Sequence, residues 1–94
     1  MAAYWIAHID ILDPTRYTDY TSVAPAAFQK YQARFLARGG QATCLEGQAY
    51  QRQVVIEFRD YETALACYHS PEYQAAKAKR QGCSVAQITI VNGL

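Results

Sequence analysis

Histidine and cysteine are scarce in this chain, with two histidines and three cysteines among 94 residues. Cys44, Cys67 and Cys83 lie far apart and form no C-x-x-C pair. Cys67 and His69 are two positions apart, so on a helix they would point to different faces and make a poor metal pair. We therefore expect no metal site. The odd number of cysteines and the absence of a signal peptide predict reduced thiols in a cytoplasmic protein.

Strong charge, long apolar runs and cofactor motifs are also missing. The formal net charge is +1, which gives little electrostatic attraction to nucleic acids or anionic lipids. No apolar run is long enough to span a bilayer. Gly39-Gly40 lacks the Lys-Ser/Thr of a phosphate-binding loop. We expect a protein with no nucleic acid partner, no membrane association and no bound cofactor.

Tyrosine, by contrast, is abundant: the chain has eight, and 51% of its residues are apolar. Tyrosine has an apolar body and a polar tip, so it suits pockets and interfaces with a wet edge. The length predicts one domain over residues 1–94. A chain of this size buries only roughly 60–65% of its unfolded surface, so a partner that covers more surface would stabilise it.

The first half of the chain predicts a strand, a helix and a second strand. Residues 3–11 alternate with period two, which is typical of a strand with two different faces. Asp13 and Pro14 predict a helix start, and Pro25 predicts a kink or a division into two short helices. Residues 34–38 can continue the helix or alternate as a strand. We favour a strand with a bulge at Gly39-Gly40 that resumes over 41–46.

The second half predicts a hairpin return, helices and a closing strand. Gly47 and the polar residues to Arg52 predict a loop, followed by a strand over 53–58. Asp60 predicts a helix N-cap, and Ser70-Pro71 a second cap that starts a helix to about Arg80. Residues 85–91 predict the last strand.

This order is β-α-β-β-α-β, the arrangement of a ferredoxin-like α+β fold with a four-stranded antiparallel sheet. Helices would cover one face of that sheet. The other face carries a mixture of polar and apolar residues, so we expect a twofold-related copy to cover it. The prediction is therefore a homodimer with two sheets packed face to face.

A set of short motifs is spread over essentially the whole chain. The motifs are Tyr4-Trp-Ile-Ala, Asp13-Pro14, Tyr17–Tyr20, Ala24-Pro25-Ala26, Phe35-Leu-Ala-Arg-Gly-Gly, Leu45-Glu-Gly, Val55-Ile-Glu-Phe and Ser70-Pro-Glu-Tyr. Together they resemble the DUF1330 family, a group of domains of unknown function that is similar to the dimeric α/β-barrel superfamily. The resemblance implies a ferredoxin-like homodimer and no particular reaction. More distant relatives of that superfamily include cofactor-free monooxygenases and small isomerases, which is an analogy of fold alone.

His8 and Glu57 are the candidate catalytic residues. His8 lies on the more polar side of the first strand and can act as a general base near neutral pH. The first and third strands are neighbours in this fold, so Glu57 is predicted to point the same way and pair with it. The alternative is structural, with His8 hydrogen-bonded at an interface and Glu57 paired with an arginine across the dimer.

The candidate ligand-binding residues are two arginines and several aromatic residues. Arg34 and Arg38 present planar guanidinium forks that match a carboxylate, although pairing with Glu46 or Glu57 explains them as well. Aromatic side chains at helical spacing are typical of a core, and they also suit the wall of an aromatic pocket. The aromatic candidates are Trp5, Tyr31 and Tyr68, together with Tyr17, Tyr20 and Phe35.

These residues favour a homodimer that binds a small aromatic or carboxylate molecule in a pocket beside the sheet. One alternative is a cofactor-independent monooxygenase or isomerase-like enzyme with His8 as its base. A second alternative is a structural or regulatory dimer with no substrate.

Overall fold

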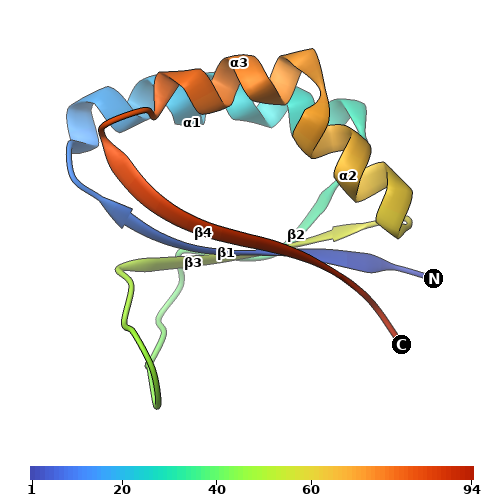
Figure 1. The fold of residues 1–94 in the computed structure, drawn as a ribbon, viewed down its shortest axis with the longest axis horizontal. Helices are drawn as coiled ribbons and strands as arrows, with labels where there is room; N and C mark the ends of the chain where they lie inside the picture. Colours follow the sequence, from blue (N-terminus) through green and yellow to red (C-terminus); the bar gives the residue numbers. More distant parts are fainter.

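The computed structural model describes all 94 residues as one antiparallel sheet with three helices on a single face (Figure 1). The strand order is β2-β3-β1-β4, with the first and third strands in the centre as predicted. None of the three helices has the length and apolar character needed to cross a membrane. The elements are β1 (Ala3–Ile11), α1 (Pro14–Lys30), β2 (Arg34–Arg38), β3 (Arg52–Phe58), α2 (Tyr61–His69), α3 (Pro71–Lys79) and β4 (Ser84–Asn92).

The core lies between the sheet and the helices, and the alternation of β1 decides which side chains enter it. Ala3, Trp5, Ala7 and Ile9 are buried toward the helices, while the residues between them lie on the opposite side. We call that opposite side the open face. The Trp5 ring packs edge-on against Phe28 of α1 at 5.3 Å and against Tyr73 of α3 at 5.0 Å. One tryptophan therefore joins the central strand to two helices.

The predicted helix starts are confirmed at the cap residues. The Asp13 side chain accepts a hydrogen bond from the Arg16 amide, and the Asp60 side chain accepts one from the Thr63 amide at 2.8 Å. Each cap satisfies a backbone donor that has no partner within the first helical turn.

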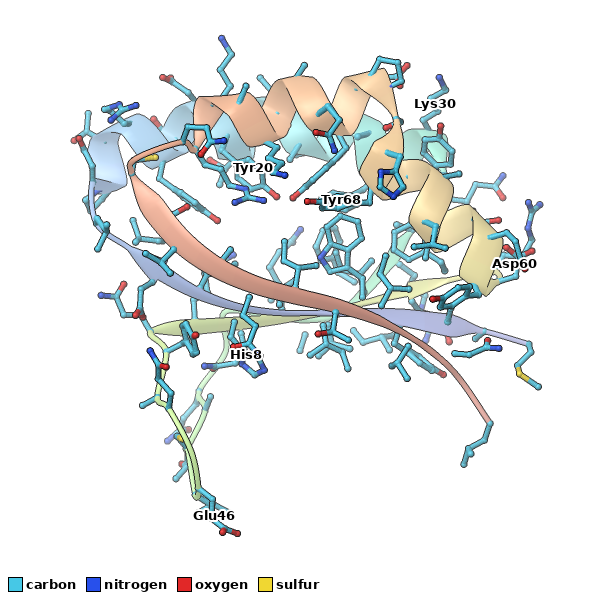
Figure 2. All side chains as sticks on the ribbon, viewed as in Figure 1. His8, Tyr20, Lys30, Glu46, Asp60 and Tyr68 are labelled. Atoms are coloured by element: carbon cyan, nitrogen blue, oxygen red, sulfur yellow. The ribbon has the colours of Figure 1, made fainter.

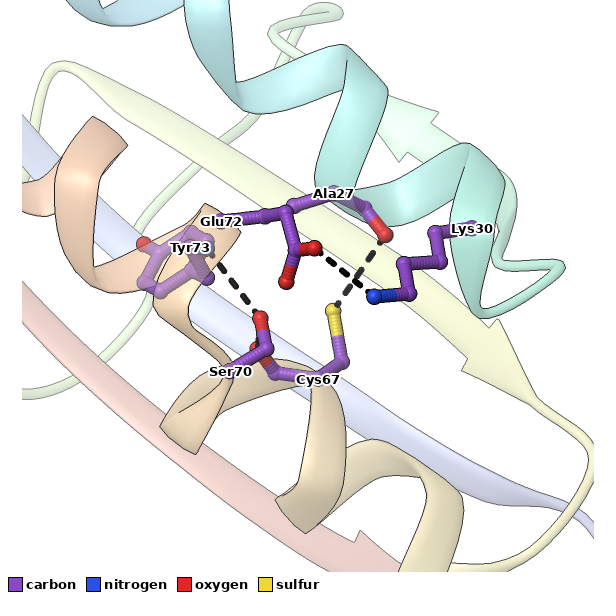
Figure 3. Close-up of polar contacts among 6 residues, drawn as sticks. All are labelled: Ala27, Lys30, Cys67, Ser70, Glu72 and Tyr73. Carbon is purple, nitrogen blue, oxygen red and sulfur yellow. Dashed lines mark hydrogen bonds and ion pairs between the residues drawn. The ribbon is translucent and has the colours of Figure 1, made fainter.

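Ser70 ends α2 and begins α3 (Figure 3). Its hydroxyl donates to the Cys67 carbonyl at 2.7 Å and accepts from the Tyr73 amide at 3.1 Å. Lys30 at the end of α1 reaches Glu72 in the first turn of α3, with the charged atoms 2.7 Å apart. The helical segment after β3 is thus divided at Ser70-Pro71 as predicted, and its second part packs beside α1.

Of the two outcomes expected at Pro25, a kink or a division into two short helices, the division is wrong. Proline lies inside α1, but the helix is a single element over Pro14–Lys30 and is not divided in two. The lost backbone donor of Pro25 is a local cost. Packing along α3, including the Tyr20 and Lys30 contacts, offsets that cost and keeps the two halves in one helix.

The predicted continuation of the second strand over 41–46 is wrong. β2 ends at Arg38, and residues 39–51, which we call the arm, project from the open face without regular structure (Figure 1). The base of the arm is fixed because the Gln51 amide donates to Asp10 Oδ1 at 2.8 Å and Gln51 Oε1 accepts from the Ile11 amide at 2.9 Å. The arm thus takes a defined direction although neither β2 nor β3 continues into it.

The bulge in the second strand is real but lies earlier than predicted. It falls between Phe35 and Ala37 and not at the two glycines. Phe35 pairs with Ile56, Ala37 with Val55 and Arg38 with Val54, so one extra residue, Leu36, is inserted. An inserted residue reverses the phase of the strand that follows it. Arg38 therefore shares the helix side of the sheet with Phe35.

Candidate functional site

A cavity of about 300 Å³ lies between α1 and the helix side of the sheet. This volume is at the small end of the range for ligand sites. Trp5 at its base is buried, whereas Thr21 and Pro25 of α1 and Arg38 of β2 are exposed, so the cavity opens between α1 and the edge strand. The lining consists of Trp5, Ala7, Ile9, Tyr17, Tyr20, Thr21, Ala24, Pro25, Phe28, Phe35, Arg38, Arg52, Val54, Ile56, Arg80, Ala86 and Ile88.

Every charged side chain in this lining is an arginine. Arg38 comes from β2, Arg52 from the start of β3, and Arg80 from the end of α3. None of the three has a carboxylate within ion-pair distance, although other basic residues of the chain do. Guanidinium groups stay charged at any physiological pH. The cavity therefore has an apolar wall and three positive charges without a counterion from the chain.

Backbone register explains why Arg38 and Arg52 are neighbours. Arg38 pairs with Val54, and Arg52 lies two residues before Val54 on the same side of β3. The Arg38 guanidinium carbon is 4.7 Å from the centre of the Phe35 ring, which holds it over the cavity edge. Gly39 has a positive φ of 69°, and a side chain there would come within 2.4 Å of Arg52 Nη1. Glycine at the start of the arm thus leaves room for the Arg52 guanidinium.

Arg80 is held by two tyrosines. Its Nη2 donates to the hydroxyl of the fully buried Tyr73 at 3.4 Å, and that hydroxyl is 2.9 Å from the hydroxyl of Tyr20. The Arg80 guanidinium carbon also lies 5.4 Å from the centre of the Tyr20 ring. These contacts orient Arg80 toward α1 from the far side of the cavity.

The tyrosine hydroxyls of the cavity are hydrogen-bond donors at neutral pH. Burial raises the pKa of Tyr20 far above its usual 10.0, and the neighbouring Tyr73 adds to this effect. Burial also raises the pKa of Tyr17, against the opposing charges of Arg52 and Arg80. Neutral hydroxyls beside guanidinium groups can donate to the oxygen of an anion. The arrangement is suited to binding negative charge.

The predicted pair of His8 and Glu57 is on one face of the sheet, but the two residues do not meet. Both belong to the open face, and Figure 2 shows His8 on the side of the sheet away from Tyr20 and Tyr68. His8 pairs with Gln53, whereas Glu57 pairs with Tyr4. Four residues along a strand separate Gln53 from Glu57, or about 13 Å.

Glu57 instead lies near Arg34, with Arg34 Nε 4.0 Å from Glu57 Oε1. This contact matches the alternative given for Arg34, which is structural pairing with Glu57. Arg34 and Arg38, both predicted as ligand-binding residues, lie on opposite sides of the sheet because the bulge separates them. Only Arg38 reaches the cavity beneath α1.

The aromatic candidates are divided in a similar way. Trp5 lines the cavity beneath α1, while Tyr68 packs on the Trp5 ring at 5.7 Å and accepts a hydrogen bond from Lys77 Nζ at 2.9 Å. Tyr31 caps the end of α1 and lies under Lys30. Tyr31 and Tyr68 are therefore outside the cavity lining and pack at the border of the core.

Sequence reasoning missed Arg52 and Arg80. Arg52 falls at the end of the predicted loop and Arg80 at the end of the predicted helix, and neither has a predicted role in ligand binding. The only sign in the sequence that these arginines are free to bind a ligand is the lack of a nearby acidic residue. Each arginine lies at the boundary of a helix or strand, with no Asp or Glu close to it in the chain. Convergence on one cavity is a property of the tertiary fold.

A second cavity, of about 600 Å³, lies on the open face beneath the arm. His8 contributes to it, with its ring 5.7 Å from that of Tyr50. The Tyr50 hydroxyl donates to Gln87 Oε1 at 3.2 Å, and the backbone carbonyl of Tyr50 accepts from Gln53 Nε2 at 3.0 Å. No three His, Cys, Asp or Glu side chains of the chain converge to hold a metal ion.

The fold and the helix-side cavity define a ferredoxin-like α+β protein with an arginine-lined site under its first helix. The sequence matches the model of DUF1330, a domain of unknown function, over residues 2–94, so the chain belongs to this family. This confirms the resemblance seen in the sequence. No curated protein matches the chain.

Solved structures share the fold at low sequence identity. A protein of unknown function from Rhodopseudomonas palustris is similar with a TM-score of 0.80 and 12% identity, over 99% of this chain and 82% of that one. The cofactor-independent oxygenase SnoaB from Streptomyces nogalater is similar with a TM-score of 0.69 and 7% identity, over 99% of this chain and 93% of that one. A dimeric ferredoxin-like protein of unknown function from Bacteroides fragilis has a TM-score of 0.66 and 12% identity, over 98% of this chain and 96% of that one. At these identities the likeness shows the fold alone.

Proposed function

We propose that the protein binds a small molecule with an acidic group on a flat apolar body, in the cavity between α1 and the sheet. The observation that carries this proposal is the set of three arginines in that cavity, each without a carboxylate partner in the chain. Aromatic and aliphatic side chains supply most of the remaining wall. A ligand anion would balance the charge, while its apolar body would be buried against Trp5 and Phe28.

The single tryptophan gives a direct test, because Trp5 lines the cavity. We would titrate the protein with benzoate and follow Trp5 fluorescence, with calorimetry as a second readout. Benzamide has the same shape without the charge and is the matched control. We expect benzoate to bind and benzamide to bind about tenfold or more weakly, since hydrogen bonds to charged groups are worth about 1.5–3 kcal/mol.

The variant Arg52→Gln should lower benzoate affinity by roughly the same factor. Arg59→Gln is the control, because Arg59 is an exposed arginine that pairs with Asp60 and does not line the cavity. Equal binding of benzoate and benzamide would contradict the proposal. So would unchanged affinity in Arg52→Gln when both variants melt like the wild type.

We propose further that the protein is a homodimer that packs through the open face of the sheet. Val85 and Val91, at the β4 edge of this face, are large exposed apolar side chains. The described dimer from Bacteroides fragilis shares the fold. Face-to-face packing would remove these side chains from water.

Sedimentation velocity tests the dimer. Val55→Glu places a charge at the centre of the open face, where Val55 pairs with Ile6, and should shift the protein to monomers. Ala75→Glu adds the same charge on the exposed side of α3 and should leave the dimer intact. A wild-type monomer at micromolar concentration would overturn this proposal without affecting the ligand site.

A second candidate function is a cofactor-independent enzyme that uses His8 as a base. The observation that favours it is the cavity beneath the arm, where the His8 ring lies beside Tyr50. Such an enzyme would turn over its substrate on the open face and not at the arginines. Activity on an enolisable or phenolic substrate that His8→Gln abolishes and Arg52→Gln leaves unchanged would support it, and unchanged turnover in His8→Gln would reject it.

A further inference from the structure

The three arginines of the helix-side cavity enter it from different sides. Arg38 belongs to β2, which is one edge of the sheet, and Arg80 precedes β4, which is the other edge. Three strand spacings separate these edges, or about 14 Å. The long arginine side chains reach inward, so that both line the same cavity. The positive charge therefore enters the site from the β2 edge through Arg38 and from the segment before β4 through Arg80.

Different contacts orient the two outer arginines. Arg38 lies over the Phe35 ring at 4.7 Å, with Arg52 as its neighbour on the same side of the sheet. Arg80 donates to the Tyr73 hydroxyl and lies against the Tyr20 ring. Neither orientation depends on the other, so the site has two separate cationic ends. Between them the cavity is lined by apolar side chains such as Ala7, Val54 and Ile88.

We propose that the ligand of this site carries two acidic groups, one at each end of a flat apolar frame. The inference rests on the proposed function and specifies its ligand class. A monoacid would leave one cationic end without a partner in a site of low polarity, where like charges repel. A diacid would place one carboxylate between Arg38 and Arg52 and the other at Arg80, each facing a guanidinium fork.

The three benzenedicarboxylates test this idea because they hold two carboxylates at increasing separations on one ring. Each would be titrated against Trp5 fluorescence and by calorimetry, at fixed ionic strength, beside benzoate. We expect at least one of the meta and para isomers to bind about tenfold or more tightly than benzoate, which is the worth of one added charged hydrogen bond. Phenyl phosphate, which carries its charge at a single end, should not match that isomer.

Variants locate the two ends. Arg38→Gln and Arg80→Gln should each reduce the affinity for the best diacid to about that for benzoate. Lys79→Gln removes an exposed charge next to Arg80 on the same helix and should keep the preference for the diacid. Arg80→Lys retains the charge without the planar fork, and it serves as the measurement if Arg80→Gln fails to fold.

The outcomes separate this inference from the proposed function. If benzoate binds and no diacid binds more tightly, the ligand has one acidic end, so the inference is wrong and the binding site stands. If phenyl phosphate binds most tightly, the arginines act on a single group, and the inference is again overturned. If neither benzoate nor any diacid binds, the proposed function itself fails.

Discussion

The hydrogen bond between Tyr20 and Tyr73 gives a quantitative test of how the cavity is held. In Tyr73→Phe the ring still fills the core, but the Tyr20 hydroxyl loses its partner at 2.9 Å and Arg80 loses its acceptor at 3.4 Å. A buried polar group left without a partner costs about 1–3 kcal/mol. In a domain of this size, each kcal/mol lowers the midpoint of thermal unfolding by about 4–8 °C.

The double variant Tyr20→Phe/Tyr73→Phe separates pairing from packing. Because both hydroxyls are removed together, neither is left unpaired, and the loss of stability should be smaller than the sum of the two single losses by about 1 kcal/mol. Chemical denaturation of the wild type, both singles and the double gives the four free energies of unfolding. Additive losses would show that the two hydroxyls do not interact, and the account of how Arg80 is oriented would then fail.

Three further predictions concern the arm, the thiols and pH. Gly39→Ala should lower the free energy of unfolding by about 1–2 kcal/mol, because φ is positive at Gly39. It should also weaken benzoate binding by displacing the Arg52 guanidinium, so a normal benzoate affinity would contradict the close approach of Arg52 to Gly39. The exposed Cys44 should react with a thiol reagent at once, whereas the buried Cys67 should react only when the protein unfolds, because burial raises its pKa to about 12. Two rapidly reacting thiols in the native protein would contradict this burial. Above pH 10 the unfolded chain releases tyrosine protons that native Tyr20 retains, so the free energy of unfolding should fall with rising pH, and less steeply in Tyr20→Phe; an equal slope in both proteins would refute the raised pKa.

The sequence predicted most local boundaries because each depends on neighbours in the chain. Asp13, Asp60 and Ser70 cap the helices that follow them, and the period-two pattern of residues 3–11 set the two faces of β1. These signals act over three or four residues, so no tertiary contact is needed to recognise them. The division into two helices, one of the two outcomes expected at Pro25, does not occur because packing against α3 outweighs the local cost.

The bulge at Leu36 is a feature that local sequence patterns do not predict. Simple alternation places Arg34 and Arg38 on one face, since they are four residues apart. The inserted residue moves Arg38 to the helix side and leaves Arg34 beside Glu57 on the open face. No residue in the stretch Phe35-Leu-Ala demands a bulge, so only the pairing of β2 with β3 decides it.

Sequence alone thus determined the fold class, the helix caps and the two faces of the central strand, because hydrophobic period and capping chemistry are local. Tertiary structure decided the site. Arg38 and Arg52 lie in two strands and Arg80 follows a helix, and all three line one cavity because strand register, a bulge and the Tyr20–Tyr73 contact direct their side chains there. Such convergence depends on long-range pairing, which the order of residues in the chain does not display.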